Sequence, residues 1–108
     1  MQQIDGKKMK SLLEKGKACA IDVDPVNEFQ RMHIRGTVNI ASSEKNFPQK
    51  VSSTANKTDN VILYGSKTSS SEISKLAKNL EKEGYKNVYA YHGNLADWNR
   101  SGLDVQRQ

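Results

Sequence analysis

Apolar residues recur along the chain at spacings that predict alternating helices and strands. Positions spaced i, i+3, i+4 predict a first helix over residues 6–15, which Gly16 ends. Residues 18–23 form a short, mostly apolar run, typical of a strand buried on both faces of a parallel sheet. A helical turn is expected at residues 28–32 and a short strand at residues 37–40.

The second half of the chain repeats this alternation more clearly. Phe47 and Val51 are four residues apart and indicate a short helix in a polar stretch. A buried strand is expected over residues 61–64, and it breaks at Gly65. Three signals indicate the next helix. Its apolar stripe consists of Ile73, Leu76, Ala77 and Leu80. Ser69 and Glu72 form a capping-box pattern at its start, and Gly84 is expected to end it. A strand over residues 88–91 and a short helix over residues 95–100 follow.

Strands that alternate with helices imply right-handed crossovers and a parallel sheet. We therefore predict an α/β fold with helices on both faces of the sheet. The 108 residues, 35% of them hydrophobic, suit a single domain spanning residues 1–108.

Composition narrows the classes of function. The net charge of +5 invites a nucleic-acid interpretation, but the one dense basic cluster, at residues 7–10, has no aromatic residues between its lysines. A solvated helix face explains this cluster better, so nucleic acid is not an expected partner. A single cysteine, Cys19, excludes an internal disulfide, and neither a metal site nor a cofactor is expected. No apolar run is long enough to cross a membrane, and a cytoplasmic location is expected.

Candidate chemistry lies in the polar segment that follows the strand at residues 61–64. In parallel sheets, ligands bind beyond the carboxyl ends of the strands, where loops lead into helix N-termini. Backbone N–H groups and hydroxyls in this segment are expected to form an anion-binding loop, made of Ser66, Lys67, Thr68, Ser69, Ser70 and Ser71. The alternative is a polar, well-capped loop without a ligand. The spacing of a Walker loop is absent.

The order of several short motifs resembles the rhodanese homology domain. The first half carries Ile21-Asp22-Val23, Glu28-Phe29 and the run from His33 to Ile40. The second half continues with the strand and loop described above, Gly84 to Val88, Gly93 and Ala96-Asp97-Trp98. The resemblance covers about residues 2–105. It implies a rhodanese fold with about five parallel strands between helices, in a family of sulfurtransferases of the thiosulfate:cyanide type.

Two positions depart from the family in ways that affect chemistry. Active relatives carry a cysteine at the first loop position, whose thiolate accepts a sulfur atom as a persulfide, and here that position is Gly65. Asp24 stands where the family usually has an arginine, so an anion replaces a cation near the site. Ser66 would need a general base to act as a nucleophile, and Cys19 is expected to be structural. No catalytic residue is therefore expected in this chain.

Other residues that match the family framework have structural interpretations first. Asp22, His33 and Trp98 are expected to support the site; His33 is interpreted as holding a turn by a hydrogen bond and Trp98 as a core or lid residue. His92 is interpreted as a solvated turn histidine.

Three hypotheses for function follow. The first is a rhodanese-like pseudoenzyme, a binding or regulatory module whose partner is a protein, or a small oxyanion or sulfur species at residues 66–71. The second is an active sulfurtransferase, if the natural sequence has a cysteine in place of Gly65 or a partner supplies the thiol. The third is nucleic-acid binding through residues 7–10.

Overall fold

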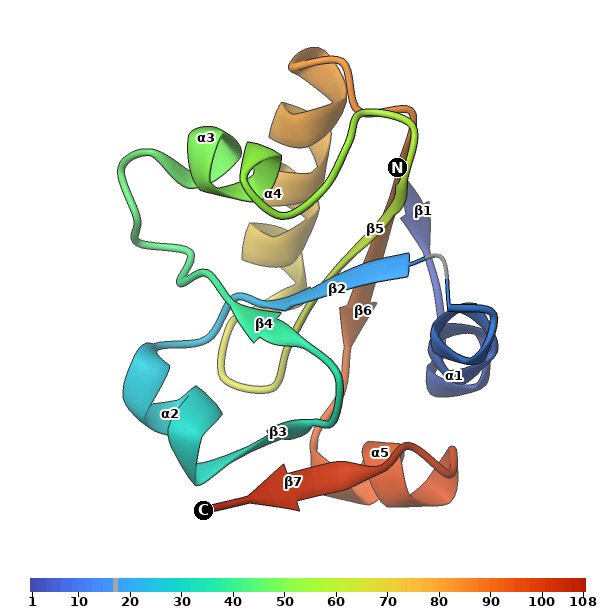
Figure 1. Ribbon diagram of the computed structural model, residues 1–108. Coiled ribbons are helices and arrows are strands. Elements are labelled where there is room, and N and C mark those ends of the chain that lie inside the picture. Colours follow the sequence, from blue (N-terminus) through green and yellow to red (C-terminus); the bar gives the residue numbers. More distant parts are fainter. Residues whose placement is uncertain (17) are drawn as a thin grey trace.

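The centre of the molecule is a five-stranded parallel sheet (Figure 1). The computed structural model describes residues 1–16 and 18–108. In spatial order the sheet contains β1 (Gln2–Gln3), β6 (Asn87–His92), β5 (Asn60–Gly65), β2 (Ala18–Asp22) and β4 (Val38–Asn39). The predicted α/β class is confirmed, and β1 is a short edge strand that sequence patterns did not indicate.

Helices cover both faces of this sheet, as predicted. Helices α1 (Gly6–Glu14) and α5 (Leu95–Arg100) place Met9, Leu12 and Trp98 in one hydrophobic cluster. Helices α3 (Phe47–Ser52) and α4 (Ser70–Lys82) place their buried residues in a second cluster. Figure 1 shows α3 and α4 on the opposite side of the sheet from α1.

The central strand β5 contributes to both clusters because successive side chains of a strand point to opposite faces. Val61 and Leu63 belong to the cluster beneath α3 and α4, and Ile62 and Tyr64 to the cluster beneath α1 and α5. All four side chains are fully buried. This continuous apolar run is what a strand covered on both faces requires.

A second, two-stranded sheet joins the middle of the chain to its last residues. β3 (Met32–Ile34) pairs antiparallel with β7 (Val105–Arg107), and α2 (Val26–Arg31) precedes β3 directly. Sequence patterns indicated only a helical turn in this region, and α2 begins two residues earlier than predicted. Each strand has three residues, too few to display a period of two.

The ends of the helices show one difference from the predicted capping. Ser69 caps α4, since its side chain accepts a hydrogen bond from the Glu72 backbone N–H at 3.1 Å. The reciprocal capping box lies instead at α5, where the side chain of Asn94 accepts from the Asp97 N–H and the side chain of Asp97 accepts from the Asn94 N–H. Asparagine and aspartate satisfy the same exposed N–H groups as the serine and glutamate of the usual motif.

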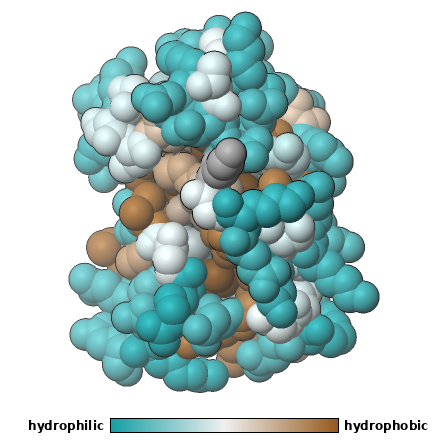
Figure 2. Space-filling model, turned by 45° about the vertical axis from the view of Figure 1, so that its right-hand side comes forward, coloured by the Kyte–Doolittle hydropathy of each residue, from teal (hydrophilic) through white to brown (hydrophobic). Residues whose placement is uncertain are grey.

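The surface is mostly polar on the face drawn in Figure 2, and hydrophobic residues reach it in narrow bands between hydrophilic ones. Lys7 and Lys8 of the basic cluster are exposed on α1. Within the described residues, every helix is too short or too polar to cross a membrane.

Candidate functional site

The predicted anion-binding segment leaves the sheet at the carboxyl end of β5. Gly65 is the last residue of that strand, residues 66–68 form the loop, and Ser69 caps α4. Ser70 and Ser71 therefore lie in the first helical turn rather than in the loop. The loop lies beside the link between β2 and α2, where β2 also ends (Figure 1).

The loop is engaged by the carboxylate of Asp24, which comes from that link. Oδ2 of Asp24 accepts from the backbone N–H of Ser66 at 3.0 Å, and Oδ1 accepts from the N–H of Thr68 at 2.9 Å. The N–H of Lys67 lies between the two oxygens, at 3.1 Å and 3.3 Å. The hydroxyls of Thr68 and Ser66 add bonds of 2.7 Å and 3.3 Å. Three consecutive N–H groups thus converge on one anionic group, as in backbone nests that bind anions.

This carboxylate is buried and is held by neutral groups. Asp24 is 3% exposed and Thr68 is 5% exposed. Among the residues that the structure describes, no lysine or arginine nitrogen lies within 4.0 Å of the Asp24 carboxylate. A buried charge is tolerated only when it is paired or well hydrogen-bonded. The loop therefore supplies the compensation for this charge.

Gly65 borders the same carboxylate. A Cβ atom placed on Gly65 would lie 2.6 Å from Oδ1 of Asp24 and 3.3 Å from Cβ of Thr68. The first distance is shorter than any ordinary contact, so a larger residue at position 65 requires Asp24 to move. Glycine is thus matched to the presence of the carboxylate in the loop.

The backbone around Asp24 is fixed by its neighbours. Oδ1 of Asp22 accepts from the Asp24 N–H at 2.9 Å, and Nδ2 of Asn39 donates to the carbonyls of Asp22 and Asp24 at 2.8 Å and 2.9 Å. The other carboxylate oxygen of Asp22 is buried and has no hydrogen-bond partner among the residues that the structure describes. Burial raises the pKa of Asp22 from 3.8 to about 7, and the negative charge of Asp24 adds to this effect, whereas the Asp24 N–H opposes it.

Tyr64 connects the end of β5 to the segment after β3. Its hydroxyl accepts from the Ile34 N–H at 3.1 Å and lies 2.8 Å from Oγ1 of Thr37. Because the Thr37 hydroxyl donates to the Ile34 carbonyl at 2.7 Å, the Tyr64 hydroxyl is the donor to Thr37. Burial is the main cause that raises the pKa of Tyr64. This tyrosine therefore acts as a neutral hydrogen-bonding group.

The residues predicted to support the site have different places in the structure. Asp22 lies beside Asp24, as described above. His33 is on β3, where Nδ1 lies 2.7 Å from the Phe29 carbonyl oxygen and the ring stacks on Phe29 with a centroid distance of 3.8 Å. Trp98 is 1% exposed in the core and meets Tyr64 edge to face at 6.0 Å. Trp98 is thus a core residue rather than a lid.

The thiol of Cys19 is far from the loop. Cys19 pairs in register with Val61, four residues before Gly65, which separates it from the loop by roughly 13 Å along the strand. Its side chain is half-buried rather than buried, and Sγ lies 3.7 Å from Oγ1 of Thr54. Across the described residues, no three histidine, cysteine, aspartate or glutamate side chains are grouped so as to hold a metal ion.

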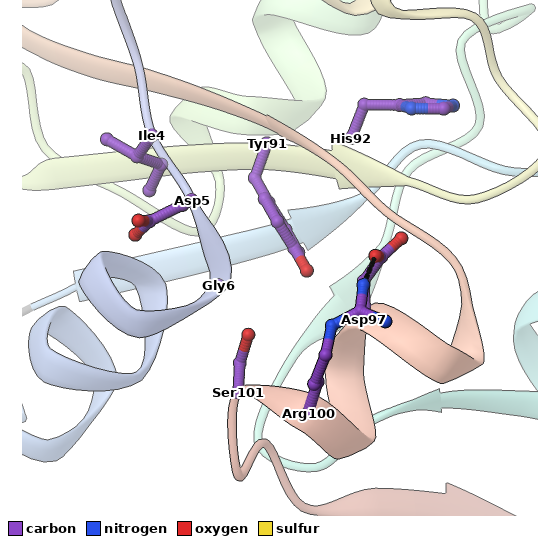
Figure 3. Close-up of a pocket in the computed structure, with 8 residues that line it drawn as sticks. All are labelled: Ile4, Asp5, Gly6, Tyr91, His92, Asp97, Arg100 and Ser101. Atoms are coloured by element: carbon purple, nitrogen blue, oxygen red, sulfur yellow. Dashed lines mark hydrogen bonds and ion pairs between the residues drawn. The ribbon is translucent and has the colours of Figure 1, made fainter.

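A cavity of about 380 Å³ lies at the carboxyl ends of β1 and β6 (Figure 3). Its lining consists of Ile4, Asp5, Gly6, Tyr91, His92, Asp97, Arg100 and Ser101. The Tyr91 hydroxyl points between α1 and α5 and is buried, with no hydrogen-bond partner in the described part of the chain. Its pKa is raised to about 12, mainly by burial. His92 is exposed, pairs in register with Gly65, and turns its ring away from Tyr91. The cavity contains no residue of the loop.

Sequence reasoning noted Asp24 as an anion near the site but missed its contacts with the loop. The two segments are 42 to 44 residues apart along the chain, and only the pairing of β2 with β5 brings them together. A signal was present, since an acidic residue directly after one strand faces a donor-rich loop after its neighbour. Adjacent parallel strands place such segments at the same edge of the sheet.

Comparisons with known proteins agree with this architecture. No curated protein matches the chain in sequence. The solution structure of the rhodanese-like domain of Alr3790 from Anabaena matches with a TM-score of 0.81 and 24% identity, covering 100% of this chain and 80% of that one. Two longer proteins contain a similar fold. The thiosulfate sulfurtransferase of Pseudomonas aeruginosa gives a TM-score of 0.77 and 19% identity, covering 100% of this chain and 20% of that one.

The second longer protein is the anaerobic ergothioneine biosynthesis enzyme of Chlorobium limicola, with a TM-score of 0.82 and 21% identity over 98% of this chain and 28% of that one. At these identities the structural likeness concerns the fold. A family model for the rhodanese-like domain matches residues 5–101. The chain therefore belongs to the rhodanese-like domain family.

Proposed function

We propose that this rhodanese-like domain does not transfer sulfur and acts as a binding or regulatory module. The observation that carries the proposal is the Asp24 carboxylate, which lies in the loop after β5 and fills the space beside Gly65. In the family that this chain resembles, a cysteine at the first loop position carries the sulfur. A glycine there has no nucleophile, and the neighbouring space is taken by an anion.

The remaining nucleophiles near the loop do not replace a thiolate. Ser66 lies beside Asp24, but its hydroxyl oxygen is 3.3 Å from a carboxylate that already accepts three backbone N–H groups. A serine hydroxyl is barely ionised at neutral pH and does not carry sulfur. Cys19 lies near the opposite end of β2, roughly 13 Å away along the strand.

The partner of such a module is a protein, or a small oxyanion or sulfur species held at the loop. Ser66, Lys67 and Ser69 give the loop a surface with polar donors, because Lys67 and Ser69 are exposed and Ser66 is half-buried. The first turn of α4 adds N–H groups that have no partner within a helix. Both features favour an anionic group on the partner.

A sulfurtransferase assay tests the proposal directly. The chain is incubated with thiosulfate and cyanide, and thiocyanate formation is measured beside a Cys19→Ser variant. We expect both proteins to remain at the background rate, and their intact masses to stay unchanged after thiosulfate. Thiocyanate formation by the unaltered chain would overturn the proposal and favour an active enzyme. Activity lost in Cys19→Ser would then identify the sulfur carrier.

A further inference from the structure

We propose that Asp24 is a built-in occupant that closes the loop to external anions, and that an oxyanion enters only when the Asp24 carboxylate leaves. This inference rests on the proposed binding function and names what controls it. Five donors of the loop, three backbone N–H groups and two hydroxyls, are directed at this one carboxylate. An external anion that uses the same donors must compete with Asp24.

The groups that bind the Asp24 carboxylate differ from those that hold the Asp24 backbone. Asn39 and Asp22 hold the backbone of Asp24, whereas the carboxylate is held by loop donors. In the proposed opening, the Asp24 side chain rotates out of the loop while these bonds keep the main chain in place. The next residues, Pro25 and Val26, are exposed, so the link lies at the surface.

The donors that become free define the ligand class. Consecutive N–H groups and two hydroxyls suit an anion with several oxygen atoms, and Lys67, exposed in the same loop, adds a positive charge. Thiosulfate, sulfite and phosphate share this chemistry. If the Asp24 carboxylate occupies the loop for about nine-tenths of the time, the apparent affinity for such an anion is about tenfold weaker than that of an open loop.

Titrations followed by amide chemical shifts test the closure. Thiosulfate, sulfite and phosphate are added separately to the unaltered chain, to Asp24→Ala and to Asp24→Asn, and the amides of residues 66–71 are observed. Glu72→Gln is the matched control, because it removes one negative charge from the exposed first turn of α4 and leaves Asp24 in place. We expect Asp24→Ala to bind at least about tenfold more tightly than the unaltered chain, with Asp24→Asn between them. Glu72→Gln should bind like the unaltered chain.

Three outcomes would overturn the inference. The first is that Asp24→Ala keeps a native spectrum and yet responds no more than the unaltered chain. The second is that Glu72→Gln gains as much as Asp24→Ala, because the gain would then be general electrostatics. The third is that both Asp24 variants lose the native spectrum, since Asp24 would then be a structural bond of the fold.

A second experiment uses the space beside Gly65. Gly65→Cys and the double variant Asp24→Ala/Gly65→Cys are incubated with thiosulfate, and the intact mass is measured. In the expected step, the thiolate attacks the outer sulfur of thiosulfate, the sulfur–sulfur bond of thiosulfate breaks, and sulfite leaves with the bonding electron pair. The cysteine then carries a persulfide, a gain of one sulfur atom. We expect the double variant to gain this sulfur at least about tenfold faster than Gly65→Cys, because the competing carboxylate is gone.

In Gly65→Cys the new side chain itself meets the Asp24 carboxylate. Equal rates in the two cysteine variants, with the amide shifts of residues 66–68 in Gly65→Cys unchanged from the unaltered chain, would overturn the closure by Asp24. Different results contradict the two proposals. Sulfur transfer by the unaltered chain would contradict the proposed function. The behaviour of the Asp24 variants tests the closure, independently of whether the unaltered chain transfers sulfur. As a control, the Cys19→Ser substitution is added to every variant, so that any sulfur gained cannot be on Cys19.

Discussion

Replacing Asp22 with asparagine should remove a pH dependence from the stability of this domain. Asp22 is 1% exposed, one of its carboxylate oxygens has no hydrogen-bond partner within residues 1–16 and 18–108, and its pKa is raised to about 7. The folded chain therefore binds a proton at this site more tightly than the unfolded chain does. Asparagine has nearly the same shape and is neutral at every pH.

The sign of the effect follows from proton linkage. Below pH 3.8 Asp22 is protonated in both states, and above pH 7 it is ionised in both. Between these values the folded state holds more protons, so the stabilisation present at low pH is lost as the pH rises through 7. A shift from 3.8 to about 7 corresponds to roughly 4 kcal/mol in the free energy of unfolding.

Urea unfolding of both proteins between pH 4 and pH 8 measures this difference. The stability of Asp22→Asn relative to the unaltered chain should rise by roughly 4 kcal/mol across this range. Other titrating groups cancel, because both proteins contain them. Asp104→Asn is the control, since Asp104 is exposed and its ion pair with Arg35 should contribute less than about 1 kcal/mol. A difference between Asp22→Asn and the unaltered chain that does not change with pH would refute the reasoning.

Three further substitutions test other contacts. Gly65→Ala should destabilise the fold by roughly 1–3 kcal/mol, because the new Cβ atom meets the Asp24 carboxylate. In a double-mutant cycle measured by urea unfolding, this loss should be smaller when Asp24 is also replaced by alanine. Equal effects in both backgrounds would contradict the contact. Asn94→Ala removes the cap of α5 and should cost about 1 kcal/mol in thermal unfolding, whereas the exposed Asn99→Ala should change little. Trp98→Ala should destabilise by roughly 3–5 kcal/mol, since the side chain is 1% exposed, and a smaller loss would mean that the core closes around the gap.

Much of the sheet and its helices could be predicted from the sequence because these elements carry their own signals. β5 is a continuous apolar run, and α4 has an apolar stripe with a serine cap and a glycine stop. The predicted bounds of α5, residues 95–100, match the structure. Burial of β5 on both faces and of one face of α4 requires these patterns, so local spacing was sufficient.

Short, polar elements could not be predicted because their pairing depends on distant segments. β1 has two exposed residues, and it exists because Gln2 and Gln3 pair with β6. β3 and β7 form by pairing with each other, 73 residues apart at His33 and Gln106. Neither edge nor partner is visible in a window of a few residues.

The position of the candidate site could be predicted from the sequence, but the hydrogen bonds between Asp24 and the loop could not. The loop after β5 follows from the rule that ligands bind at the carboxyl ends of parallel strands. The substitution of an anion at Asp24 was visible, but its bonds to Ser66 and Thr68 depend on the twist and register of β2 and β5. Those contacts are geometric facts that residue types alone do not determine.

The contact between position 65 and Asp24 also restricts the order in which the domain can change during evolution. A side chain acquired at position 65 while Asp24 remains meets a carboxylate oxygen at 2.6 Å and destabilises the loop. An exchange of Asp24 first removes this contact and makes room at position 65. A mutational path toward a side chain at position 65 therefore runs through position 24. We therefore expect a change at position 65 to be disfavoured until position 24 has changed.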